Sequence, residues 1–136
     1  MPRSMTRRTK TSAALAAALA ALALSALAGA GAQASPVATA SKTCSLSTQE
    51  QRHLGASYVT SLKVVGTTCS KGKTVVEDFH ACRNDNGGKN GKCTSKVDGY
   101  SCTEHRYDAV PDVQYNSRVK CERGDKVVRH TYTQNL

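Results

Sequence analysis

The sequence predicts a small disulfide-stapled α+β domain, an antiparallel sheet of about four strands packed on one main helix. The hydrophobic pattern changes along the chain from alternating to helical and back to alternating. Apolar content is low, with one Phe and no Trp, so burial alone gives a chain of this size little stability. An even number of cysteines supplies covalent cross-links instead. They are Cys44, Cys69, Cys82, Cys93, Cys102 and Cys121.

The N-terminus is typical of an export signal. A basic start without acidic residues leads into an Ala/Leu run over residues 13–28, and Ala32-Gln33-Ala34 has the small residues that signal peptidase recognises. We therefore predict a signal peptide over residues 1–34 and secretion to the extracellular space. An uncleaved anchor is the alternative, although alanine contributes little to bilayer transfer. Arg7-Arg8 leaves twin-arginine export open beside general secretion.

The remaining chain divides into a flexible N-terminal segment, residues 35–43, and a single domain, residues 44–136. The whole chain carries +9; the signal accounts for four positive charges and no negative ones, so the mature chain carries +5. Its charges are interspersed, without a long basic run. We expect a monomer without a cofactor or a membrane span, which binds anionic cell-wall or envelope polymers weakly and has no specific nucleic-acid site.

The first half of the domain begins with a short helix. Ser47-Thr48-Gln49-Glu50 is a capping box, and Gly55 is suited to end the helix that follows it. Residues 58–65 alternate and are rich in β-branched side chains, which predicts a strand that Gly66 ends. The main helix then begins at Cys69.

Helical spacing in the main helix places apolar side chains on one stripe. Val75, Val76 and Phe79 are expected to face the sheet, and Thr67 or Thr68 to cap the helix. The Asn/Gly-rich stretch that follows is a loop by composition. Three strands forming a meander are predicted beyond it, over residues 99–107, 114–121 and 127–133.

Fifteen pairings of the six cysteines are possible. We predict a Cys82–Cys93 bridge, because these residues flank the Asn/Gly loop and closing it costs little entropy. Cys69 at the start of the helix and Cys121 at the end of a strand form the next predicted pair. The remaining predicted pair is Cys44–Cys102.

Several segments of the domain resemble a group of small secreted actinobacterial proteins. The resemblance implies the fold and secretion, and it transfers no catalytic residue. The segments that carry it are Leu54–Leu62, Gly66–Cys69, Val75-Val76, Phe79-His80, Cys82-Arg83, Gly99–Cys102 and Val119–Gly124.

Candidate catalytic residues do not form a recognisable nucleophile motif. Glu77 and His80, three apart on one helix, are suited to act as a base and its orienting partner, but a surface pair is the preferred interpretation. His130 is expected to be half-buried packing on a strand. The other candidates are His53, His105, Asp78, Glu104 and Asp108.

A zinc site is the alternative to disulfides, with His80 and Cys82 beside Cys102 and His105 as ligands. An exported chain with paired cysteines favours oxidation, so we assign no metal site and no catalytic residue.

The expected function is a non-catalytic binding or structural module of the cell exterior. A secreted protease inhibitor is the alternative, with residues 108–113 or 84–92 as the inhibitory loop. Such a loop has to be exposed, extended and held at both ends by bridges. A small secreted hydrolase ranks third.

Overall fold

A computed structural model of the protein describes residues 39–136. The predicted signal peptide over residues 1–34 lies outside the described residues, as does the cleavage site after Ala34. The described chain forms five strands, two α-helices and a short 3-10 helix. In chain order they are β1 (Lys42–Cys44), α1 (Thr48–His53), β2 (Tyr58–Val65), α2 (Cys69–Asp85), η1 (Gly88–Asn90), β3 (Ser101–Val110), β4 (Gln114–Arg123) and β5 (Lys126–Asn135).

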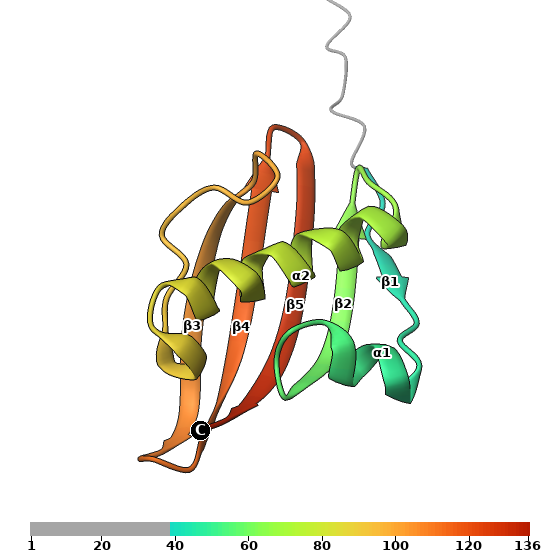
Figure 1. Cartoon of the computed structure of the whole chain (residues 1–136). Helices are drawn as coiled ribbons and strands as arrows, with labels where there is room; N and C mark the ends of the chain where they lie inside the picture. Colours follow the sequence, from blue (N-terminus) through green and yellow to red (C-terminus); the bar gives the residue numbers. More distant parts are fainter. Residues whose placement is uncertain (1–38) are drawn as a thin grey trace, which may run out of the picture. The chain divides into compact units, whose positions relative to one another are not determined.

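All five strands form one antiparallel sheet with the order β1-β2-β5-β4-β3. The meander β3-β4-β5 forms one side, and β5 returns to pair with β2 (Figure 1). Helix α2 runs across one face of this sheet (Figure 1). The predicted fold class, an α+β domain with one main helix on an antiparallel sheet, is confirmed, with a fifth strand added.

The added strand is β1, which begins inside the segment predicted to be flexible. Lys42 pairs with Val64 and Thr43 pairs with Lys63, so two residues of the 35–43 segment belong to the sheet. A strand of three residues is too short to show a hydrophobic period.

The helix starts follow the sequence pattern. Ser47 caps α1, and both halves of its capping box with Glu50 are formed. Thr68 caps α2 by accepting from the backbone N–H of Lys71. Gly72 then permits a close approach to the sheet, because a Cβ there would lie 2.7 Å from a methyl carbon of Val64.

The core lies between α2 and the sheet. The helix buries Val75, Val76 and Phe79 completely, as the stripe predicts. From the sheet, Leu62 and Val128 pack against this stripe and are likewise fully buried. The polar side chains of His80, His130 and Arg83 are buried in the same layer, between α2 and the sheet.

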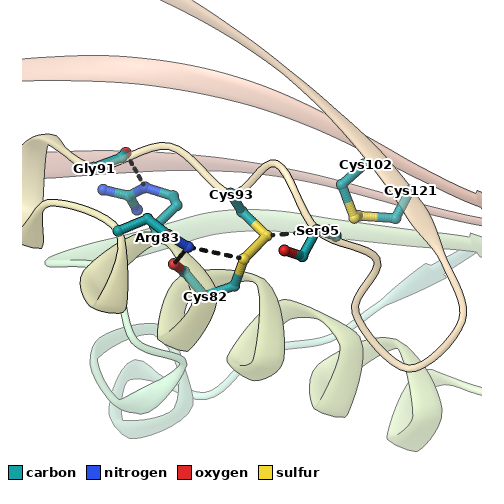
Figure 2. Close-up of a disulfide and its surroundings, with 8 residues drawn as sticks. Cys82, Arg83, Gly91, Cys93, Ser95, Cys102 and Cys121 are labelled. Carbon is teal, nitrogen blue, oxygen red and sulfur yellow. Dashed lines mark hydrogen bonds between the residues drawn. A yellow bond between two sulfur atoms is a disulfide. The ribbon is translucent and has the colours of Figure 1, made fainter.

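The structure contains three disulfides, and the described residues include no free cysteine. The predicted Cys82–Cys93 bridge is present and joins the end of α2 to the loop that follows it (Figure 2). The predicted pairs Cys69–Cys121 and Cys44–Cys102 are wrong. The pairs in the structure are Cys44–Cys69 and Cys102–Cys121.

The two wrong pairings have a common cause. Cys102 and Cys121 lie directly opposite each other on β3 and β4, with Cα atoms 4.0 Å apart. Cys44 lies on β1, beside the start of α2, so Cys69 is its near partner. The Cys44–Cys69 bridge depends on the position of β1, and the Cys102–Cys121 bridge depends on the β3–β4 register. Local sequence patterns specify neither.

Three disulfides indicate that the domain matures in an oxidising environment. Among the helices of residues 39–136, none has the length and apolar character needed to cross a membrane.

Candidate functional site

The two faces of the sheet differ in cover and in chemistry. Side chains alternate between the faces along each strand, and α2 lies across one of them (Figure 1). We call this the covered face and the opposite one the open face. Both faces carry basic residues. Those of the covered face are buried among hydrogen-bond acceptors, whereas those of the open face point away from α2.

On the covered face, Arg83 in the last turn of α2 has a fully buried side chain. Its Nη2 donates to the Tyr115 hydroxyl at 2.7 Å and to the Lys89 carbonyl at 2.6 Å. Its Nε donates to the Gly91 carbonyl at 3.3 Å (Figure 2). Nη1 donates to Nδ1 of His80 at 2.6 Å. The guanidinium therefore joins the α2–β3 loop to the sheet.

Two buried imidazoles, His80 and His130, lie beside this arginine with ring centroids 5.3 Å apart. Burial lowers the pKa of His80 to about 2, and the charges of His130 and Arg83 add to the effect. Burial, with Arg83 second, lowers the pKa of His130 to about 3. Both rings are neutral at ordinary pH. Since arginine only donates, Nδ1 of His80 accepts and its proton lies on Nε2.

Glu104 on β3 is the acid of this cluster, and its side chain is 11% exposed. Its carboxylate accepts from Nε of Arg106 at 2.9 Å and from the Tyr132 hydroxyl. Burial raises the pKa of Glu104, but these bonds outweigh it and bring the pKa below its ordinary value. Burial, followed by the bond to Glu104, raises the pKa of Tyr132. The acid is held by fixed partners rather than presented to solvent.

The catalytic candidates from the sequence do not assemble into an accessible site. The pairing of Glu77 with His80 is wrong, both as a catalytic and as a surface pair, because Glu77 is exposed and His80 is buried against Arg83. His130 is buried more deeply than predicted, at 2% exposed. The remaining candidates are dispersed: His53 at the end of α1, Asp78 on exposed α2 surface, His105 on the open face, Glu104 on the covered face and Asp108 near the end of β3.

The residues of the zinc alternative are likewise separated. Cys82 and Cys102 belong to different disulfides. His80, on the sheet-facing side of α2, is buried, whereas His105 is exposed on the open face. Within residues 39–136, no group of three or more potential metal ligands comes together.

The open face has a row of cations at its centre. One register position crosses all five strands, and its three middle members are basic. From β1 to β3 the row reads Thr43, Lys63, Arg129, Lys120 and Thr103. The chain neighbours of each basic residue are buried under α2, so the three cations point to the open side. We call Lys63, Arg129 and Lys120 the cation row.

Neighbouring strands are about 4.8 Å apart, so the cation row spans about 10 Å between its outer members. Lys120 forms an exposed ion pair with Glu122, 2.6 Å between Nζ and Oε1. Within residues 39–136, Lys63 and Arg129 have no acidic partner. Like charges directly opposite each other destabilise a sheet. The row is thus a local conflict with the fold, of the kind found where a surface serves a function.

A second row of basic side chains lies beside the cation row. Arg118 and His105 lie opposite each other on β4 and β3, one step along the strands from the cation row. The Arg118 guanidinium lies over the Tyr107 ring, 4.7 Å from its centroid. Both rows line a shallow hollow of about 420 Å³, whose hydroxyl groups come from Ser61, Thr103 and Thr131.

Sequence reasoning recognised the positive charge but missed the row. Its members lie on three strands, and the longest chain separation joins Lys63 to Arg129. One local signal was present, because a tight turn at Gly124-Asp125 places Lys120 opposite Arg129. The pairing of β2 with β5 leaves no such signal in the sequence.

The two loops considered for protease inhibition differ from an extended inhibitory segment. The loop closed by Cys82–Cys93 contains η1 and two glycines with positive φ, Gly87 and Gly88. The other is a turn in which the Val113 N–H donates to the Val110 carbonyl at 3.1 Å. Neither loop combines an extended backbone with bridges at both ends.

Comparison of the chain with protein-family models, with curated proteins and with solved structures found no match.

Proposed function

We propose that this protein is a secreted, non-catalytic binding module that attaches to anionic polymers of the cell exterior through the open face of its sheet. The observation that carries the proposal is the cation row, Lys63, Arg129 and Lys120, aligned on three neighbouring strands. Aligned cations in a hollow raise the local concentration of anions and the rate at which they associate. Secretion, as the export signal and the actinobacterial resemblance imply, places this face in contact with wall and envelope polymers.

The covered face supports the non-catalytic part of the proposal. Its imidazoles are buried and have lowered pKa values, and its acid is engaged by Arg106 and Tyr132. A general base has to reach the proton that it removes. On the open face, His105 lacks an acidic neighbour across the strands, because it lies opposite Arg118.

The test is sedimentation of the folded mature domain, residues 35–136, with isolated cell envelopes. We expect binding that weakens steeply as salt rises, because the contacts are between exposed charges. Replacing the whole cation row by threonine should abolish binding at physiological ionic strength.

The matched control replaces Lys89, Lys92 and Lys96 by threonine. These lysines are exposed, lie between α2 and β3 and do not line the hollow of the cation row, and their replacement changes the net charge by the same amount. Envelope binding that falls equally in both variants would mean that only net charge matters and would contradict a site on the open face.

A further inference from the structure

The geometry points to a specific ligand class: a phosphate polymer without rings, such as a polyol phosphate or polyphosphate chain, which lies across the strands along the cation row. This inference rests on the proposed function and adds the chemistry and the direction of the ligand. It uses three properties of the open face: the alignment of its cations, the kinds of donor that it carries and the positions of its aromatic side chains.

The alignment sets the direction. Lys63, Arg129 and Lys120 form a line perpendicular to the strands, because they share one register position on β2, β5 and β4. The backbone positions of its outer members lie about 10 Å apart, so contacts to separate phosphates fit the row without drawing its side chains together. A polymer with repeated charges satisfies the whole row when it crosses the strands. Thr43 and Thr103 continue the row at both ends with neutral hydroxyls.

The donors favour phosphate. Lysine is a compact point charge and arginine a planar fork, and both are common phosphate binders. Arg129 in the centre of the row is flanked by lysines, and Arg118 supplies a second guanidinium one step along β4. Hydroxyls of Ser61, Thr103 and Thr131 line the same hollow. A phosphate group keeps its negative charge and two free oxygens along a diester chain, so it matches this set.

The aromatic side chains do not favour a ligand that binds by stacking, such as a single-stranded nucleic acid. Single-stranded nucleic acids gain much of their affinity by stacking bases on exposed aromatic rings. The open face carries two tyrosines, Tyr58 and Tyr107, and neither lines the hollow of the cation row. The Arg118 guanidinium lies over one face of the Tyr107 ring. The chain has no Trp, and its one Phe, Phe79, is fully buried. The hollow of the cation row therefore offers charge and hydroxyl contacts without a Tyr, Phe or Trp ring for stacking.

The experiment measures binding of the folded mature domain to four probes by titration calorimetry at several salt concentrations. The probes are long-chain inorganic polyphosphate, orthophosphate, poly-glutamate of equal charge and an oligothymidylate. We expect polyphosphate to bind about tenfold more tightly than poly-glutamate or oligothymidylate, and orthophosphate not to compete. Each single replacement in the cation row should reduce the salt slope of polyphosphate binding by about 0.7–0.9.

The variants are Lys63→Thr, Arg129→Thr and Lys120→Thr, with Lys96→Thr as the control away from the face. Circular dichroism verifies that each is folded. Equal binding of poly-glutamate and polyphosphate, or tighter binding of oligothymidylate, would overturn the phosphate class while leaving the proposed function intact. Competition by orthophosphate, or equal slopes for all four variants, would overturn the row as the ligand track. Failure of every polyanion to bind would overturn both proposals.

Discussion

The covered and open faces of the sheet both carry arginine, and they use it in opposite ways. Arg83 on the covered face is fully buried, with its donors engaged by carbonyls, a hydroxyl and an imidazole. Arg129 on the open face is exposed and lies between two lysines. The Arg83 guanidinium is bound by groups of the protein itself, whereas the Arg129 guanidinium has no acidic partner within residues 39–136. This difference separates a charge that holds the fold together from a charge that is available to a partner.

The largest test of this difference is removal of the buried guanidinium. Arg83→Met should lower the free energy of unfolding by about 2–4 kcal/mol, because it leaves the buried Nδ1 of His80 without its donor and removes the donor to the Tyr115 hydroxyl. The Lys89 and Gly91 carbonyls lose one of two donors each, since Tyr115 and Arg106 still donate to them. Arg118→Thr on the open face should change it by less than about 0.5 kcal/mol. Urea denaturation of both variants measures the contrast, and equal losses would contradict it.

Removing single disulfides tests how much the buried Arg83 contacts contribute to the stability of the covered face. Chain entropy gives each bridge about 3 kcal/mol, because the sequence separations of 25, 11 and 19 enter only as logarithms. Cys82–Cys93 also holds the loop whose Gly91 carbonyl accepts from Arg83 (Figure 2). Cys102–Cys121 adds to a β3–β4 ladder that is already paired. The Cys82→Ala/Cys93→Ala variant should therefore melt below Cys102→Ala/Cys121→Ala; the reverse order in thermal melts would refute this account.

Acid should act on the covered face through its neutral histidines. Both His80 and His130 have a folded-state pKa far below the ordinary 6.5, so only the unfolded chain takes up their protons as pH falls from 6.5. Stability is complete above that pH and should decline by about 2 kcal/mol per histidine between pH 7 and pH 5. Denaturation of His130→Phe and the parent at both pH values gives the measurement. The variant should lose about half of the dependence, and an unchanged dependence would be inconsistent with a neutral buried ring.

The smallest expected effect is a gain, not a loss, in the free energy of unfolding. Arg129→Thr should raise the free energy of unfolding by about 0.5 kcal/mol, because it removes a like charge from between Lys63 and Lys120. The gain should fade in 1 M salt, which screens exposed charges within about 3 Å. Lys96→Thr, outside the row, is the control and should show no gain. A loss of stability in Arg129→Thr would mean that the row is structural rather than available to a ligand.

Local patterns predicted most of the fold, because α1, β2 and α2 have caps, periods and stop signals within a few residues of one another. The buried arginine had a local signal as well, since Arg83 continues the helical stripe of Val76 and Phe79. From the sequence alone, an arginine in the last turn of a helix is expected to be exposed to solvent, and its burial becomes apparent only once its partners are known. Those partners come from β4 and from the α2–β3 loop, which only the tertiary structure brings together.

The candidate site was harder to predict than the fold. Alternation alone places Lys120 and Arg129 on one face of their strands, and the short β4–β5 turn sets them opposite each other. Lys63 joins them only because β5 returns to β2, a pairing of residues far apart in the chain. The two wrong disulfides have the same origin. Long-range pairings decided the place of Lys63 in the row and the two bridges that were predicted wrongly, and these pairings leave no local signal in the sequence.

The position of β5 has a consequence for how the molecule is made. The last strand of the chain, Lys126–Asn135, lies between β2 and β4 (Figure 1), and the Leu136 N–H donates to the Val113 carbonyl at 2.9 Å. Because β5 follows β2, β3 and β4 in the chain, the sheet cannot close before β5 has been synthesised. During that interval β2 lacks its long neighbour, and only neighbouring segments can pair. The sheet of the nascent chain therefore stays open until β5 is made, and loss of β5 would leave β1-β2 and β4-β3 as two separate pairs of strands.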